Sequence, residues 1–191
     1  MSTNYADGTY WRQRSDLLYY QYFRYIMRCI GAEATSLVDV GSGNAPYLEW
    51  FDWIPERVSV DIRTPYASET VRGVQGDILK LDLPRFDICT CLQVLEHIPD
   101  PAPFARRLLG LGAVVLVSVP LRWPAGATRG HVNDPVDLDK LTEWFGVAAN
   151  YHLAVREPFT GPKGARLFAL YDPADPARRF GAETRNARRP A

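Results

Sequence analysis

In residues 38–46, VDVGSGNAP, an apolar run ends in a Gly-x-Gly turn, and a proline follows soon after it. Glycine lets the backbone adopt turn conformations and approach a ligand closely, and the free amides at the start of a following helix can bind an anion. Nicotinamide and flavin sites use the spacing G-x-G-x-x-G, in which the third glycine allows close packing of the helix. Pro46 occupies that third place here. The turn therefore predicts a ligand site between a strand and a helix, without naming the ligand.

On both sides of this turn, short β-branched runs alternate with longer amphipathic stretches. This pattern is typical of a parallel sheet flanked by helices. Residues 114–119 are apolar at nearly every position, as expected of a strand that is covered on both faces. We therefore predict a doubly wound, Rossmann-like α/β fold, with strands at 36–40, 57–61, 71–76, 86–91, 113–119, 151–157 and 165–171 and helices at 11–30, 45–53, 101–110 and 136–145, the last opening at Asp134-Pro135.

The length of the chain, 191 residues, suits one domain with a single core. We expect this domain to span residues 1–172, with residues 1–30 forming an N-terminal helical cap. Residues 173–191 contain five arginines and one glutamate and have no apolar periodicity. Such a composition predicts a flexible basic tail.

Charge and cysteine usage narrow the function classes. The 22 Lys and Arg residues balance the 22 Asp and Glu residues, so a polyanionic partner such as nucleic acid is not indicated. No apolar run approaches the roughly 20 residues of a membrane span, and the first residues lack the apolar core of a secretory signal. We therefore expect a cytoplasmic protein. The three cysteines have no metal-type spacing, so we predict that they pack in the core and that there is no metal site.

Acidic residues accompany the predicted strands in order. Asp39 lies two residues before Gly41, Asp61 ends the run VSVD, and Asp77 follows VQG. The stretch FDICTCLQVLEHIPDP, residues 86–101, begins with the fourth strand. Together, and in this order, these motifs resemble those of the class I S-adenosylmethionine-dependent methyltransferases.

The resemblance covers about residues 36–104, and Ala45 stands where the family's first motif has its last glycine. It implies S-adenosyl-L-methionine as the methyl donor and S-adenosyl-L-homocysteine as the product. The end of the chain, 151–171, is similar to the closing strand pair of the family. The resemblance thus implies an enzyme with a seven-stranded, mostly parallel sheet whose last strand is antiparallel.

The expected cofactor contacts combine chemistry with this resemblance. Asp61 can accept hydrogen bonds from both ribose hydroxyls, or it caps the next segment. The resemblance implies that Asp39 faces the methionine ammonium group; a buried carboxylate bonded to the backbone is the alternative. Asp77 can accept from the adenine amino group, beside an apolar wall, or form a turn. The predicted cofactor-binding set is Arg12, Asp39, Gly41, Ser42, Gly43, Asp61, Ile62, Asp77, Ile78 and Gln93.

Two histidines are candidates for catalysis. A sulfonium methyl group is already activated, so alignment and exclusion of water supply much of the rate, and a histidine base assists when the acceptor carries a proton. His131 lies in the long loop 120–137 after the fifth strand and is the first candidate for the base or for a substrate contact. His97 is the second, with a structural contact to the backbone as its alternative.

The acceptor pocket has to come from the N-terminal segment and the 120–137 loop, because no separate substrate domain is evident. Arg12 would belong to a lid over this pocket. We predict a small-molecule acceptor, such as a sugar or a secondary metabolite, that is methylated on oxygen or nitrogen. The alternatives are a nucleic-acid or protein acceptor, for which the arginine-rich tail is the main support, and a non-catalytic partner subunit. The oligomeric state is not predicted.

Overall fold

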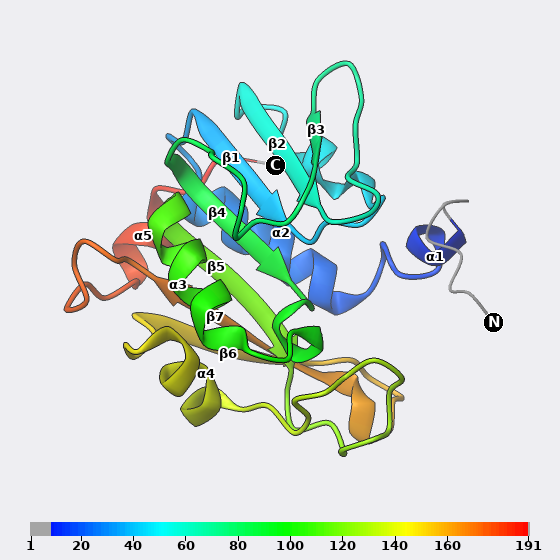
Figure 1. The fold of residues 1–191 in the computed structure, drawn as a ribbon. Helices are drawn as coiled ribbons and strands as arrows, with labels where there is room; N and C mark the ends of the chain where they lie inside the picture. Colours follow the sequence, from blue (N-terminus) through cyan, green and yellow to red (C-terminus); the bar gives the residue numbers. More distant parts are fainter. Residues whose placement is uncertain (1–8, 191) are drawn as a thin grey trace.

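The computed structural model describes residues 9–190. Its strands are β1 (Ser36–Val40), β2 (Glu56–Asp61), β3 (Arg72–Gln75), β4 (Phe86–Leu92), β5 (Gly112–Pro120), β6 (Tyr151–Arg156) and β7 (Ala165–Tyr171). They form one seven-stranded sheet in the order β3-β2-β1-β4-β5-β7-β6 (Figure 1). The predicted doubly wound α/β fold is therefore confirmed, and each strand lies within one residue of its predicted ends.

The direction of the strands places the candidate site at one edge of the sheet. Strands β1 to β5 run parallel, whereas β7 is antiparallel to both of its neighbours, β5 and β6. This confirms the predicted antiparallel last strand. The chain extends the sheet to one side of β1 through β2 and β3, and to the other side through β4 and β5. Ligands of open α/β sheets bind where the order reverses in this way, at the carboxyl ends of the strands.

Helices cover both faces of the sheet (Figure 1). Their bounds are α2 (Leu18–Ile30), η2 (Pro46–Phe51), α3 (Pro101–Leu111) and α4 (Leu138–Phe145). Val115 and Val117 of β5 pack in the core cluster that includes α3 and α4, whereas Leu116 packs in the cluster that includes α2 and η2. The alternation along β5 therefore buries both faces of this strand, as its continuous apolar sequence predicts.

The N-terminal helix predicted over 11–30 is divided into α1 (Thr9–Arg12) and α2. The start of α2 is fixed by Glu157, whose carboxylate accepts hydrogen bonds from the amides of Leu18 at 3.1 Å and Tyr19 at 2.8 Å. These amides have no partner inside the helix, so the carboxylate acts as a cap supplied by a distant segment. A local sequence pattern does not reveal such a cap, which is why the predicted helix was too long.

Two further helix predictions need correction. The helix predicted at 136–145 is α4, and Asp137 caps it by accepting a hydrogen bond from the Lys140 amide at 3.1 Å. The predicted opening at Asp134-Pro135 is wrong because the Asp134 carboxylate bonds a histidine instead. The helix predicted over 45–53 is the shorter 3-10 helix η2, a form that proteins use in short pieces.

The segment after β7 includes α5 (Ala182–Asn186). Asn150 Nδ2 donates to the carbonyls of Asp175 at 2.9 Å and Arg178 at 3.0 Å, so part of this segment contacts the domain. The expected domain limits and the flexibility of the tail stay predictions, and residues 1–8 of the predicted cap lie outside the described part. Within that part, no helix has the length and apolar character needed to cross a membrane.

Candidate functional site

The glycine turn lies at the carboxyl end of β1, beside the end of β2. Gly41 has a φ of +83°, and its amide donates to the Val60 carbonyl at 2.7 Å. A Cβ atom at Gly41 would lie 2.4 Å from Val94 Cγ2, so a larger residue requires displacement of the neighbour. Gly43 has a φ of +52°, but no atom would lie within 4 Å of its Cβ. The turn is therefore closed on the side of Gly41 and open beside Gly43, where a ligand can approach the backbone.

Asp61, at the end of β2, faces the glycine turn. Its Oδ2 accepts a hydrogen bond from the Gly43 amide at 3.0 Å, and its Oδ1 accepts from the amides of Arg63 at 2.7 Å and Thr64 at 2.9 Å. Asp61 thus caps the next segment and also contacts the turn. Because a carboxylate oxygen has two lone pairs, Oδ2 can accept a second hydrogen bond from a ligand. The next residue, Ile62, is 65% exposed and adds an apolar wall beside the carboxylate.

Asp39 is fully buried, and hydroxyl groups bond both of its oxygens. Thr90 Oγ1 donates to Oδ1 at 2.5 Å, and the Tyr47 hydroxyl donates to Oδ2 at 2.7 Å. Burial raises the pKa of Asp39 to about 6, although both hydrogen bonds favour the charged form. Asp39 therefore bonds side chains, whereas the alternative interpretation expected bonds to the backbone. Ser42, the residue between the two glycines, bonds the Ser59 hydroxyl in a similar buried pair, and a direct contact of Asp39 with a ligand stays a prediction.

Asp77 follows β3 and forms a turn. Its Oδ1 accepts from the Leu79 amide at 3.0 Å, and its carboxylate lies 3.7 Å from Lys80 Nζ. Ile78, predicted as an apolar wall for the adenine, is 2% exposed and belongs to the core, whereas Leu79 is 49% exposed. The apolar surface available to a ligand at this strand end is therefore that of Leu79, which the sequence reading did not include.

Gln93 follows β4 and has an unusual backbone conformation. Its φ is +58°, a value that residues other than glycine rarely adopt. Its amide donates to the Ser118 carbonyl at 2.9 Å, and its Nε2 donates to Ser118 Oγ at 3.2 Å. Ser118 Oγ also bonds the Tyr19 hydroxyl at 2.5 Å. Strained residues of this kind cluster at functional sites, and here a hydrogen-bond chain connects Gln93 to α2.

The two candidate histidines lie against each other although they are far apart in sequence. The rings of His97 and His131 meet edge to face with centroids 4.7 Å apart. His131 Nδ1 bonds Asp134 Oδ2 at 2.6 Å, and His97 Nδ1 bonds the Gly130 carbonyl at 2.9 Å. Because the acceptors fix the proton on Nδ1, Nε2 of each ring is free to accept a proton or bind a ligand. The predicted backbone contact of His97 is present, and burial lowers the pKa of this ring.

Glu96 lies beside these histidines and is almost fully buried. Its Oε2 has no hydrogen-bond partner within the described residues, and burial raises its pKa to about 8. One donor atom from each of Glu96, His97 and His131 lies within 4.8 Å of the others. Two imidazoles and a carboxylate are ligands that divalent transition metals accept. The sequence reading predicted no metal site, because 34 residues of chain separate the two histidines and no short motif joins them.

The 120–137 loop is held against the end of β4. The Glu96 carbonyl accepts from the Val132 amide at 2.9 Å, and Asn133 Nδ2 donates to the Ile98 carbonyl at 2.7 Å. Trp123, from the start of the same loop, stacks on the His131 ring with centroids 5.7 Å apart. These contacts bring the loop to the edge of the sheet where β4 and β5 end.

The N-terminal segment contacts the same edge through Trp11. Its ring packs against Tyr47, the donor to Asp39, with centroids 5.6 Å apart, and against Tyr20 and Trp50. Arg12, at the end of α1, is exposed. The predicted contact between Arg12 and a cofactor stays a prediction. Its neighbour Trp11 packs on Tyr47, whose hydroxyl donates to Asp39.

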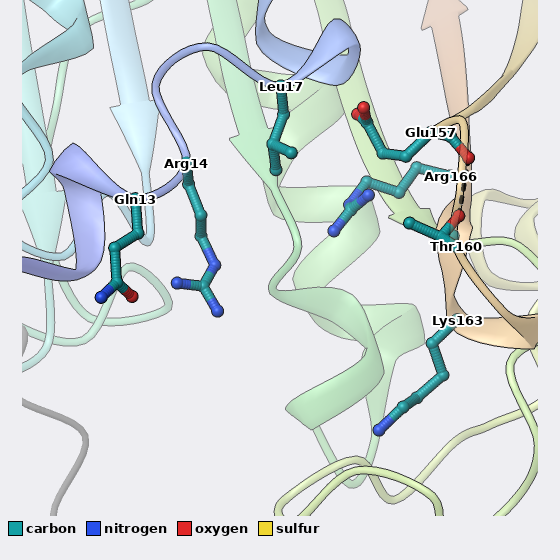
Figure 2. Close-up of a pocket in the computed structure, with 8 residues that line it drawn as sticks. Gln13, Arg14, Leu17, Glu157, Thr160, Lys163 and Arg166 are labelled. Carbon is teal, nitrogen blue, oxygen red and sulfur yellow. Dashed lines mark hydrogen bonds between the residues drawn. The ribbon is translucent and has the colours of Figure 1, made fainter.

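A cleft of about 310 Å³ lies between the N-terminal segment and the β6–β7 hairpin. Figure 2 shows Arg14 on one side of the cleft and Arg166 directed into it from β7, whereas Lys163 points toward the 120–137 loop and Glu157 turns toward the start of α2. Sequence reasoning missed this cleft because its walls come from opposite ends of the chain. The only signal was the group of three cationic residues itself, and single arginines and lysines are more often solvated.

The comparisons with known proteins agree with this geometry. A family model described as "Methyltransferase domain" matches residues 38–111, which contain the glycine turn, Asp61, Asp77, Gln93 and Glu96. A ubiquinone biosynthesis O-methyltransferase from Alkalilimnicola ehrlichii is 29% identical over 122 residues, or 52% of this chain and 48% of that protein. Another from Pseudomonas aeruginosa is 37% identical over 70 residues, or 35% of this chain and 27% of that protein. The chain thus spans less than half the length of these curated relatives.

A solved structure extends the likeness to most of the chain. The N-methyltransferase NodS from Bradyrhizobium japonicum, in complex with S-adenosyl-L-homocysteine, superposes with a TM-score of 0.67. The match covers 87% of this chain and 93% of that one, at 14% sequence identity. At this identity, the likeness concerns the fold.

Proposed function

Because the chain belongs to the class I S-adenosylmethionine-dependent methyltransferases, we propose that it transfers a methyl group from S-adenosylmethionine to an oxygen atom of a small molecule. The proposal rests on the contact between the residues that follow β1 and the residue that ends β2. The Gly43 amide bonds Asp61 Oδ2 at 3.0 Å, beside a turn that leaves open space. A carboxylate that can bind ribose hydroxyls and a glycine turn that can receive an amino acid lie at the ends of adjacent strands. This arrangement suits a ligand in which a nucleoside is joined to an amino acid.

The residues at this edge fit the parts of the cofactor. Asp61 would accept from the ribose hydroxyls, and the exposed Ile62 and Leu79 would provide apolar walls for the base. The open turn at Gly43 would receive the methionine end. Asp39 would act through Tyr47 and Thr90, whose hydroxyls it holds in place.

Bound S-adenosylmethionine supplies a sulfonium methyl group that is already activated for transfer. His131 would act as the base: its Nδ1 bonds Asp134 Oδ2 at 2.6 Å, so Nε2 would be free to accept the proton of an acceptor hydroxyl. The cofactor would supply the methyl group and retain the sulfur as a thioether, and His131 Nε2 would take up the proton that the acceptor hydroxyl loses. The remaining acceleration comes from alignment of the reactants and exclusion of water.

The acceptor would enter between the N-terminal segment and the 120–137 loop. Trp123 offers aromatic surface there, and Gln93 lies just after the end of β4. Transfer to oxygen is favoured over transfer to nitrogen because the relatives with detectable sequence identity are named O-methyltransferases and because a hydroxyl needs a base such as His131.

Calorimetric titration of the purified protein with S-adenosylmethionine, S-adenosylhomocysteine and NAD tests the proposal. We expect the first two to bind in the micromolar range and NAD not to bind. Asp61→Ala should weaken the binding of both by at least tenfold, since it removes the ribose acceptor. Asp139→Ala, at an exposed position of α4, is the matched control and should bind as the wild type does. If neither cofactor form binds, the non-catalytic partner subunit replaces the methyltransferase proposal.

A further inference from the structure

Arg166 carries an unsatisfied positive charge at the wall of the cleft. It lies on β7, and its guanidinium lies over the Tyr19 ring at 5.1 Å and over the Trp123 ring at 5.4 Å. The two rings hold the side chain in place without using its N–H groups. Within residues 9–190, no hydrogen bond or ion pair to this guanidinium is found. Five N–H donors in a fixed plane are thus available to a ligand.

A second cation faces the same space. Lys163 lies in the turn between β6 and β7, and its Nζ donates one hydrogen bond, to the Ala127 carbonyl at 2.9 Å. An ammonium group has three donors, so two remain for a ligand or for water. The bond to Ala127 also joins the hairpin to the 120–137 loop, which carries Trp123 and His131. Lys163 and Arg166 both line the cleft from the β6–β7 hairpin, and Figure 2 shows Arg166 directed into it and Lys163 directed toward the 120–137 loop.

Among the described residues that line the cleft, the only acidic one is Glu157, and its carboxylate is engaged elsewhere. Both oxygens of Glu157 accept hydrogen bonds from the first amides of α2, at 2.8 and 3.1 Å, and Glu157 is 6% exposed. It forms no ion pair with Lys163 or Arg166 in the described part of the chain. Within the described residues, Glu157 therefore does not neutralise Lys163 or Arg166, and an anionic ligand would gain from both charges.

The position of Arg166 separates this charge from the cofactor end of the site. Arg166 pairs with Pro120 at the end of β5, and the sheet order places β7 three strands from β1. At the usual strand spacing this is roughly 14 Å, too far for a residue on β7 to hold the group that lies against the β1 turn. The hydrogen-bond chain from Gln93 through Ser118 to Tyr19 ends under Arg166. The charge therefore lies on the acceptor side of the transfer point.

From this arrangement we propose that the cleft binds an anionic group of the methyl acceptor, a carboxylate or a phosphate, with Arg166 as its main anchor and Lys163 as the second. The proposal rests on the proposed function, since it defines the substrate class for that site: a hydroxylated acid or a phosphate ester. The anion would stay fixed by Arg166 while the hydroxyl to be methylated reaches His131, whose ring stacks on the same Trp123.

Binding is tested with fragments that carry only the anion. In the presence of saturating S-adenosylhomocysteine, arginine Nε–Hε resonances are followed by NMR while benzoate, benzamide or inorganic phosphate is added. The Arg166 resonance, assigned by its loss in Arg166→Gln, should shift saturably with benzoate or phosphate and not with benzamide. A dissociation constant of about 1–10 mM is expected for a single charged anchor. The anion that binds more tightly shows whether the cleft prefers a carboxylate or a phosphate group.

The control is Arg156, which is exposed on β6 and does not line the cleft. Its resonance should respond only to ionic strength, and Arg156→Gln should leave the response of Arg166 unchanged. Arg166→Lys should retain part of the benzoate binding through another resonance, that of Lys163. Absence of a saturable Arg166 shift with either anion overturns the proposal. The result does not depend on activity, so failure of S-adenosylhomocysteine to bind would overturn the proposed function alone.

Transfer assays then test the link to catalysis. The matched pair 3,4-dihydroxybenzoate and 3,4-dihydroxybenzamide differs only in the anionic group. We expect kcat/KM for the acid to exceed that for the amide by at least tenfold, and Arg166→Gln to remove this preference without changing S-adenosylhomocysteine affinity. Equal use of both compounds by a protein that methylates them would contradict the proposed acceptor class.

Discussion

The two halves of the carboxyl edge are built in different ways. In the half formed by β1, β2 and β3, each candidate ligand-binding residue lies within a few residues of its own strand: Gly43 after β1, Asp61 at the end of β2, and Asp77 after β3. In the half formed by β4, β5 and β7, the walls come from α2, the 120–137 loop and the last hairpin. A site made of strand ends can be read from local sequence, whereas a site made of distant segments needs the fold.

The largest effect is expected from a substitution in the glycine turn of the first half. In Gly41→Ala, the added Cβ would lie 2.4 Å from Val94 Cγ2 at a backbone φ of +83°, so the turn or Val94 has to shift. We expect S-adenosylhomocysteine binding to weaken by about 100-fold or more, with a loss of about 1–3 kcal/mol in the free energy of unfolding. Calorimetric titration and urea unfolding measure the two quantities.

Gly43→Ala is the matched control, because φ is again positive but no atom lies within 4 Å of the new Cβ. It should lose less stability in urea than Gly41→Ala, because the strain of the positive φ remains but the contact with Val94 does not. The two variants are compared on unfolding, since the new Cβ at Gly43 would enter the space that is open to a ligand. Gly41→Ala combined with Val94→Ala should recover part of the binding. Equal effects of the two single glycine variants would mean that the positive φ, and not the contact with Val94, determines the turn.

The second prediction addresses the other half through His131. Replacing it with glutamine removes the proposed base but keeps a polar side chain in the loop. We expect the rate of methyl transfer to fall by about 100-fold, while the affinity for S-adenosylhomocysteine stays within twofold, because the cofactor residues lie on other strands. Steady-state assays with an acceptor that the wild type methylates give the rate.

His152→Gln, at an exposed position of β6, should behave as the wild type does. Asp134→Asn should lower the rate less than His131→Gln, because the imidazole remains but its Nδ1 partner changes. Normal rates in His131→Gln would mean that His97 or water, and not His131, acts as the base.

The sequence predicted the fold, and it indicated the residues of the first half of the candidate site more completely than those of the second. The strands could be predicted because apolar runs with turn residues between them are local patterns, and Asp61 could be placed because it ends such a run. Ile78 and Leu79 show the limit, since adjacent residues alternate between core and surface and only the turn at Asp77 decides which is exposed. His131 was a candidate from its loop alone.

The partners of these residues could not be predicted from the sequence. Asp134 was assigned to a helix start, but its contact with His131 makes it part of the site. Glu157 reads as a charged residue at the end of a strand, and its role as the cap of α2 depends on a contact across most of the chain. In the sequence, Arg166 is an ordinary strand arginine. Its contacts with the rings of Tyr19 and Trp123 depend on the fold.

The third prediction compares one buried carboxyl group from each half. Burial raises the pKa of Glu96 to about 8, and one of its oxygens lacks a partner. The native state therefore keeps a proton that the unfolded chain releases near pH 4.5, so the group lowers stability progressively as the pH rises from about 4.5 to 8 and no further above that. Glu96→Gln should remove this loss, on the order of 3 kcal/mol at pH 9 relative to pH 5.

Urea unfolding of wild type and Glu96→Gln across this pH range measures the difference between them. Asp39→Asn is the matched variant in the first half. The pKa of Asp39 is raised only to about 6 because two hydroxyls bond its oxygens, so the corresponding pH dependence should be smaller and end near pH 6. An identical pH profile for wild type and Glu96→Gln would place the Glu96 carboxylate in contact with a compensating charge.

The smallest expected effect concerns the segment that joins the two halves. Trp11 packs on Tyr47, whose hydroxyl holds Asp39, so α1 lies close to the turn and Arg12 can reach a carboxylate bound there. An exposed arginine has little electrostatic effect because water and salt screen it. Arg12→Ala should therefore weaken S-adenosylhomocysteine binding by only about three- to tenfold, and less at high salt. Arg24→Ala, an exposed α2 residue over the Trp50 ring, controls for lost charge. If both variants bind alike at low salt, the N-terminal segment contributes through the aromatic contacts of Trp11, and its lid function belongs to the acceptor half.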